Sequence, residues 1–224
     1  MKKAILVLSL VLMASMAMAQ TTAIYDIQNG SATGTVTVQG IVMATDNYHH
    51  TWVADAQGAW NGILVFNETV STSYVVGDEV SITGEVNEYY NMTQIYNVTA
   101  HSQISTGNTP YAPIIVTCAD LDDDIGADTA PAEQYEGCLV QIQNAICVTE
   151  QETTYYEATV SDDGETNVTI IDDDANYQMG FGMTAGNYYN ITGVVTFGYG
   201  QYKVNPRDAT DIEPGSSVSN WELY

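Results

Sequence analysis

Residues 76–98 read "VGDEVSITGEVNEYYNMTQIYNV", and residues 185–204 read "AGNYYNITGVVTFGYGQYKV". The two stretches share five identical residues at one constant offset of 109: Gly77 and Gly186, Ile82 and Ile191, Thr83 and Thr192, Gly84 and Gly193, Val86 and Val195. Matches at a constant offset indicate an internal repeat, which has to be recognised before a fold is assigned. The chain therefore contains two copies of one strand, each with a glycine in its middle and tyrosines nearby.

The repeat extends outward from these stretches. Residues 36–45, "VTVQGIVMAT", align with residues 140–149, "VQIQNAICVT", at an offset of 104. Residues 58–66, "GAWNGILVF", align with residues 164–172, "GETNVTIID", at an offset of 106. The offset changes where turn residues fall, so we infer two copies of one domain that differ in loop length.

Each copy alternates apolar and polar residues with a period of two and is rich in β-branched residues, which is typical of half-buried strands. We predict strands at 35–44, 50–55, 61–67, 79–88 and 93–100, and at 138–148, 155–161, 166–172, 187–197 and 200–206. The gap at residues 67–76 has room for one turn of helix. Five short antiparallel strands with a gap after the third are typical of the OB-fold barrel. The predicted fold is all-β, two tandem five-stranded OB-like barrels, with Gly40, Gly84 and Gly193 where strands bend.

The domain boundaries follow from the repeat and from composition. We expect a signal peptide at 1–19, a first barrel at 20–108, an acidic lead-in or linker at 109–136, a second barrel at 137–213 and a C-terminal linker at 214–224. Lys2 and Lys3, an apolar run and the small-residue site before Gln20 are typical of a cleaved secretory signal. We therefore expect an extracellular or cell-surface protein with no membrane insertion after cleavage.

Charge limits the classes of ligand. The chain has 4 basic and 28 acidic residues; loss of Lys2 and Lys3 would leave two basic residues, Lys203 and Arg207, and a net charge of −26. Binding to a phosphate backbone depends on basic residues that displace counterions, so this composition disfavours nucleic acids. Anionic membrane surfaces are disfavoured for the same reason. The balance favours neutral ligands and divalent cations.

Neither the cysteines nor the acidic clusters identify a disulfide or a metal site with certainty. The three cysteines are Cys118, Cys138 and Cys147, an odd number, so pairing and oligomeric state stay open, and buried free thiols are the favoured interpretation. Alternating acids in the lead-in are a weak match to a calcium loop, because its sixth position is Ile125 and its twelfth is Pro131. The candidate ligands of this weak calcium site are Asp120, Asp122, Asp124 and Asp128. A solvated acidic turn is favoured over a calcium site for these residues, and no cofactor is predicted.

Aromatic residues provide the candidate binding site. In an OB-fold the ligand surface is the face of strands two and three with the loops beside it. Six residues fall on that face or its loops in the first copy: Tyr48, His50, Trp52, Trp60, Tyr89 and Tyr90. Such rings can stack on bases or sugars, and the competing interpretation is that the tryptophans only close the barrel core. The sequence has no Gly-x-Ser-x-Gly elbow and no phosphate loop, so we expect no enzyme.

The segments "GIVMAT", "WVADAQGAWNGILVF" and "AEQYEGCLVQIQN" resemble OB-fold-like repeats of secreted proteins from Bacteroidetes-like bacteria. Such repeats occur in extracellular nucleases and multidomain surface proteins, so the resemblance implies a nucleic-acid-binding accessory module. The tail at 217–224 is similar to the lead-in of a type IX sorting domain, whose diagnostic residues are absent from this sequence. Charge instead favours a secreted, non-catalytic binding or adhesion module for a neutral glycan or a peptide. A structural spacer of a surface protein is the third interpretation.

Overall fold

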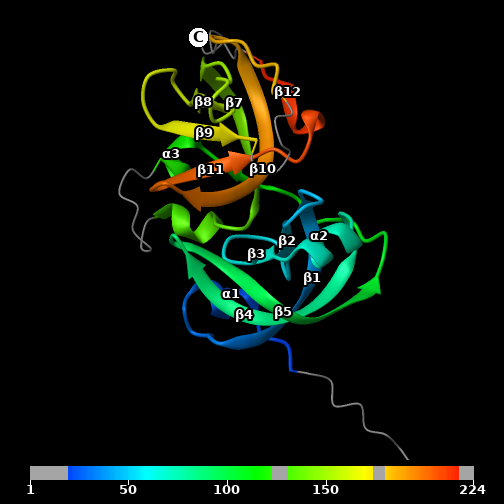
Figure 1. Ribbon diagram of the computed structural model, residues 1–224. Coiled ribbons are helices and arrows are strands. Elements are labelled where there is room, and N and C mark those ends of the chain that lie inside the picture. Colours follow the sequence, from blue (N-terminus) through cyan, green and yellow to red (C-terminus); the bar gives the residue numbers. More distant parts are fainter. Residues whose placement is uncertain (1–19, 123–130, 174–179, 217–224) are drawn as a thin grey trace, which may run out of the picture.

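The computed structural model describes residues 20–122, 131–173 and 180–216 (Figure 1). The predicted signal peptide, Asp124, Asp128 and the tail at 217–224 lie outside the described residues. Within these ranges, none of the helices has the length and apolar character needed to cross a membrane.

The first barrel is a closed ring of five strands in the order β1-β2-β3-β5-β4. Their bounds are β1 Thr35–Thr45, β2 His50–Ala54, β3 Gly62–Phe66, β4 Glu79–Tyr89 and β5 Met92–Ser105. The β3–β5 pair is parallel and the other pairs are antiparallel. Helix α1, Ile24–Gln28, precedes the barrel, and helix α2, Glu68–Ser73, occupies the predicted gap between the third and fourth strands.

The second barrel repeats the same order of pairing. Its strands are β7 Leu139–Thr149, β8 Glu157–Ser161, β9 Val168–Asp172, β10 Tyr188–Gly198 and β11 Gln201–Asn205. An additional β10–β7 pairing closes these five strands into a ring, and β9 and β11 run parallel as β3 and β5 do. Two short strands extend the sheet, β6 Ile114–Val116 beside β7 and β12 Ile212–Pro214 beside β10.

The predicted all-β fold of two tandem OB-like barrels is confirmed, and the predicted strands match within a few residues. The largest difference is β5, which continues to Ser105 because its second half pairs with the first residues of β4. Three short helices add to the fold: α3 Cys118–Leu121, η1 Pro131–Tyr135 and η2 Ala209–Asp211. Strand β6, α3 and η1 all lie in the predicted lead-in.

The mid-strand glycines of the repeat have a physical reason. A Cβ on Gly84 would lie 2.7 Å from the carbonyl oxygen of Tyr96, and one on Gly193 would lie 2.6 Å from that of Asn205. In both barrels the fourth strand thus passes too close to the fifth for any side chain. This close approach explains why both copies carry a glycine at equivalent positions.

The two barrels pack directly against one another. Val53, Ile63 and Val65 point into the interior of the first barrel, where they join its own core. Their neighbours Trp52 and Leu64 point outward and belong to a second core that continues into the second barrel. The outer face of β2 and β3 is therefore covered over much of its length by the second barrel.

Backbone contacts fix this interface. The backbones of Gly62 and Gly137 approach so closely that a Cβ on Gly62 would lie 2.3 Å from the carbonyl oxygen of Gly137. Nearby, the N–H of Trp60 donates to the carbonyl oxygen of Gln134 at 2.7 Å. The N–H of Thr93 donates to the carboxylate of Glu136 at 2.8 Å.

Glu136 is fully buried in the interface, and its second oxygen, Oε2, has no hydrogen-bond partner among the described residues. Burial raises the pKa of Glu136 well above its usual value; the charge of Glu133 raises it further, and the Thr93 N–H opposes the rise. A neutral carboxyl is the form that this position favours.

All three cysteines are buried free thiols, as the favoured interpretation expected, and no disulfide joins Cys118 to Cys138. Burial, and then the charge of Asp162, raises the pKa of Cys118 to about 12. Burial raises the pKa of Cys138 to about 11. Thiols with such pKa values are poor nucleophiles at neutral pH.

Candidate ligand-binding surface

The loop between β1 and β2 is ordered by one carboxylate. Asp46 Oδ1 accepts hydrogen bonds from the backbone N–H groups of Tyr48, His49 and His50 at 2.8–2.9 Å. Asp46 Oδ2 lies 2.7 Å from His50 Nδ1. Burial alone would raise the pKa of Asp46, but the hydrogen bonds from His50 and Tyr48 outweigh it and hold the pKa at about 2. The loop is thus anchored by a carboxylate that is charged at neutral pH.

This anchored loop presents a set of rings that we call the ring cluster: Tyr48, His49, His50 and Phe66. The ring centroids of Tyr48 and His49 are 3.8 Å apart, and Phe66 lies 5.4 Å from each histidine ring. Phe66 reaches the cluster because β2 and β3 pair His50 with Phe66. Tyr48 is 50% exposed and Phe66 is 42% exposed, so the cluster is an open aromatic surface.

Trp52 lies beneath this surface rather than on it. Its ring centroid is 5.8 Å from that of His50, yet only 2% of the residue is exposed. Its indole Nε1 is buried without a hydrogen-bond partner among the described residues. Trp52 was a predicted ligand-contacting ring, but its burial in the core that continues into the second barrel fits the competing interpretation, a tryptophan that closes the core.

Trp60 lies at the junction between the barrels. Its φ of +69° is unusual for a bulky residue, and the Trp60 N–H bond to Gln134 helps to hold it. The half-buried Trp60 ring meets that of Tyr25 edge to face, with centroids 6.5 Å apart. These two rings form a separate aromatic contact between helix α1 and the loop that joins β2 to β3.

Tyr89 and Tyr90 form the tip of the β4–β5 hairpin. They are 59% and 78% exposed, and their rings meet edge to face at 4.7 Å. Parallel pairing of β3 and β5 puts this tip near Gly62, at the opposite end of β3 from Phe66, about 13 Å away at ~3.3 Å per residue. The six predicted residues therefore do not form one surface. Tyr48 and His50 lie near the Phe66 end of β3, whereas Tyr89 and Tyr90 lie near its Gly62 end.

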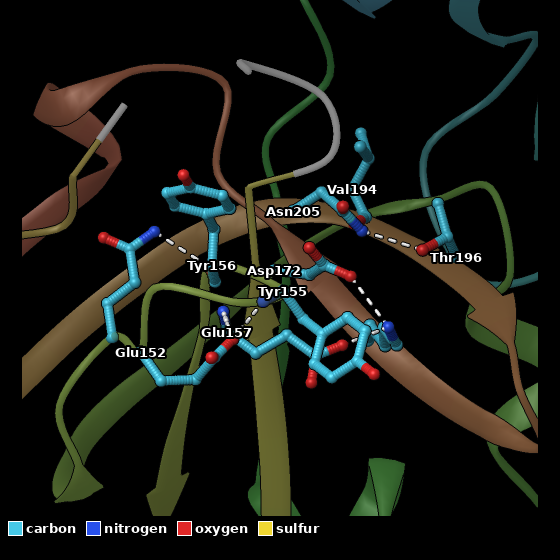
Figure 2. Close-up of polar contacts among 10 residues, drawn as sticks. Glu152, Tyr155, Tyr156, Glu157, Asp172, Val194, Thr196 and Asn205 are labelled. Atoms are coloured by element: carbon cyan, nitrogen blue, oxygen red, sulfur yellow. Dashed lines mark hydrogen bonds and ion pairs between the residues drawn. The ribbon is translucent and has the colours of Figure 1, made fainter. Parts of the chain in front are cut away.

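The second barrel has a related loop between β7 and β8 (Figure 2). Glu152 accepts hydrogen bonds from the backbone N–H groups of Thr154 and Tyr155, as Asp46 does in the first barrel. Tyr155 is 71% exposed. Beside this loop, Figure 2 shows Glu157 and Asp172 facing each other across adjacent strands. An acid-anchored loop with an exposed tyrosine is thus common to both barrels, but the second has no histidine.

Both basic residues outside the predicted signal peptide are held in ion pairs. Lys203 Nζ lies 2.8 Å from Asp172 and also contacts Glu157, and only 7% of Lys203 is exposed. Arg207 forms a two-pronged pair with Asp211, at 2.7 and 2.8 Å. Because the sequence has no other Lys or Arg after residue 3, no basic groove is available to a polyanion.

The predicted calcium ligands are only partly described. Asp120 forms a capping box with Thr117 at the start of α3, so its carboxylate has a structural role. Asp124 and Asp128 fall outside the described residues. Among the described residues, no group of three or more His, Cys, Asp or Glu side chains is placed to hold a metal ion.

Two contributors to the surface were missed from the sequence: Asp46 and Phe66. Asp46 precedes a turn, where an aspartate commonly accepts hydrogen bonds from backbone groups two or three residues on, and this signal could have identified it. Phe66 ends a predicted strand, and its proximity to His50 depends on strand register, which a single sequence does not define.

Comparison with known proteins is uninformative about family. No protein-family model matches the chain, and no curated protein matches it significantly. Among solved structures, the HINb domain of p204 is similar over 77% of this chain and 93% of that domain, with 10% identity and a TM-score of 0.35. At this level the likeness supports no conclusion about ligand. The resemblance to secreted bacterial repeats stays a prediction.

Proposed function

We propose that the protein is an exported, non-catalytic module whose ring cluster binds a neutral oligosaccharide. The observation that carries this proposal is the ring cluster: exposed Tyr48 and half-buried His49 and His50, which Asp46 holds in place, beside exposed Phe66 at the end of β3. A loop ordered in advance lowers the entropy cost of binding. Exposed aromatic faces beside polar groups suit the apolar faces and hydroxyls of sugar rings.

The choice of oligosaccharide follows from charge. OB-folds bind oligonucleotides and oligosaccharides through the face and loops where the ring cluster lies. Oligonucleotide binding combines stacking with a basic groove along the backbone. Here Lys203 and Arg207 are both engaged by carboxylates, and the protein carries a large negative charge. A polyanion would be repelled, whereas a neutral sugar would not.

The test is binding to a panel of neutral oligosaccharides by the protein and by two variants, Tyr48→Ala and Phe66→Ala. Loss of one stacking ring is worth about 1–3 kcal/mol, so each variant should bind about 5- to 150-fold more weakly. The matched control is Tyr199→Ala, which removes a 99% exposed tyrosine from the second barrel and should leave affinity unchanged.

Other outcomes would identify the competing functions. Binding confined to peptides, with the same dependence on Tyr48 and Phe66, would keep the ring cluster as the site and replace the ligand. Salt-sensitive binding to oligonucleotides would favour an accessory role beside a nuclease. Absence of binding to all three classes would favour a structural spacer.

A further inference from the structure

A hollow with a volume of about 450 Å³ lies at the opposite end of β2 from the ring cluster's loop, beside Asp55. Its floor is the middle of β1 at Gly40 and Ile41, and Thr22 and Tyr111 contribute to its walls. Small-molecule sites commonly have volumes of about 300–1,000 Å³. The hollow is therefore large enough for a small organic ligand.

Strand register places two carboxylates on either side of this floor. Ile41 of β1 pairs with Glu79 of β4 on one side and with Ala54 of β2 on the other. Asp55 follows Ala54 directly, so Asp55 and Glu79 flank the same point of β1. Both residues line the hollow.

Asp55 has one oxygen without a protein partner. Its Oδ2 accepts a hydrogen bond from the N–H of Ile24 at 2.8 Å. Its Oδ1 is buried and has no partner among the described residues. Burial raises the pKa of Asp55, the Ile24 N–H opposes the rise, and the charge of Asp26 adds to it. Asp55 as a whole is half-buried and lines the hollow, and no lysine or arginine among the described residues lies beside its carboxylate, so its charge is not compensated there by the protein.

The charged side chains that line the hollow are both carboxylates, and the hydroxyls of Thr21 and Thr22 add groups that can donate or accept. The carboxylate of Glu79 accepts from Gln39 and from Ser105, each at 2.8 Å, and has further lone pairs. The Tyr111 hydroxyl donates to the carbonyl oxygen of Asp55 at 3.1 Å, so towards the hollow it can only accept. Among the described residues, no lysine or arginine lines the hollow. A ligand that fits must bring donors and positive charge.

We propose that this hollow binds a small organic cation carrying an ammonium or guanidinium group, placed between Asp55 and Glu79. An ammonium offers three donors and no acceptor, and a guanidinium offers five, which complements an acceptor-rich lining. The same lining rejects phosphates and carboxylates. The site is separate from the ring cluster and does not depend on the proposed sugar ligand.

The test is calorimetric titration of the exported protein with 1,4-diaminobutane and agmatine, with 1,4-butanediol as the uncharged analogue of equal chain length. We expect saturable one-to-one binding of a cation and none of the diol. Asp55→Asn and Glu79→Gln should each weaken binding by about tenfold or more, because each removes a charged partner at nearly constant shape. An unchanged thermal midpoint would show that a variant is folded.

Controls separate this site from general attraction to an acidic protein. Glu213→Gln removes one negative charge from an exposed position outside the hollow and should leave affinity unchanged. Tyr48→Ala should also bind the cation normally, whatever its effect on sugars. An arginine-containing tripeptide with blocked ends distinguishes a side-chain ligand from a free amine. Equal weakening by Glu213→Gln, binding of the diol, or calcium binding without amine binding would overturn the proposal.

Discussion

A methyl group added at Gly62 tests whether the two barrels are locked together as described. In Gly62→Ala the new Cβ would lie 2.3 Å from the carbonyl oxygen of Gly137, 2.6 Å from its carbonyl carbon and 2.7 Å from the backbone nitrogen of Cys138. All three atoms belong to backbone, so no side-chain rotation relieves the contact. Since comfortable C···O contacts are about 3.3 Å or longer, the barrels would have to separate locally by about 1 Å.

The cost can be estimated from the contacts involved. Overpacking of a well-packed site costs about 1–3 kcal/mol. Separation also strains the hydrogen bonds from Trp60 to Gln134 and from Thr93 to Glu136, and loss of either would add about 1 kcal/mol. We therefore expect Gly62→Ala to lower the free energy of unfolding by about 1–4 kcal/mol.

The assay is denaturant unfolding followed by tryptophan fluorescence, because Trp52 and Trp60 both lie at the interface, and by circular dichroism for both barrels. Gly198→Ala is the matched control, since Gly198 has no positive φ and nothing within 4 Å of an added Cβ. The control should change stability by no more than about 0.5 kcal/mol. If Gly62→Ala and Gly198→Ala unfold at the same denaturant concentration, in one transition seen by both probes, then Gly62 is not in tight contact with Gly137 and the packing proposed at the interface is wrong.

Three further substitutions have defined outcomes. Glu136→Gln should raise stability at pH 7 and not below pH 4. Because the pKa of Glu136 is raised in the folded state, the protein loses stability as pH rises above 4.5, the ordinary pKa of a glutamate, and glutamine removes this loss. Unfolding measured from pH 4 to 8 checks this. Asp46→Ala should cost about 1–3 kcal/mol, since it leaves three part-buried backbone N–H groups without their acceptor, and should broaden the NMR signals of Tyr48. Lys203→Met should cost about 3–5 kcal/mol in thermal or chemical unfolding, because two adjacent carboxylates lose their cation.

The barrels themselves could be predicted because their signal is local. Period-two alternation and turn residues define each strand, and the repeat supplies two independent views of the same pattern. The mid-strand glycines, Gly84 and Gly193, were recognisable as bends, and the structure adds the reason, close approach to the backbone of the next strand. These features depend on neighbours along the chain or in an adjacent strand.

The interface could not be predicted in the same way, because packing between barrels leaves only a weak local signal. "TWVA" in β2 and "ILV" in β3 are continuous apolar runs, and such runs are typical of strands buried on both faces. That signal was present, and interpreting Trp52 as an open platform overlooked it. Tyr48 and His50 were correctly placed at the β1–β2 loop, but the contribution of Phe66 required knowledge of strand register.

The most direct test of the central claim is a comparison of ligand classes at two salt concentrations. Intrinsic fluorescence of a protein comprising residues 20–224 would be titrated with neutral oligosaccharides and, in parallel, with oligo-dT. The ring of Trp52 lies 5.8 Å from that of His50 in the ring cluster and would report occupancy. We predict saturable sugar binding that is unchanged by salt and is lost in the Tyr48→Ala Phe66→Ala double variant. Binding of oligo-dT that weakens steeply with salt, with no response to any sugar, would contradict the account.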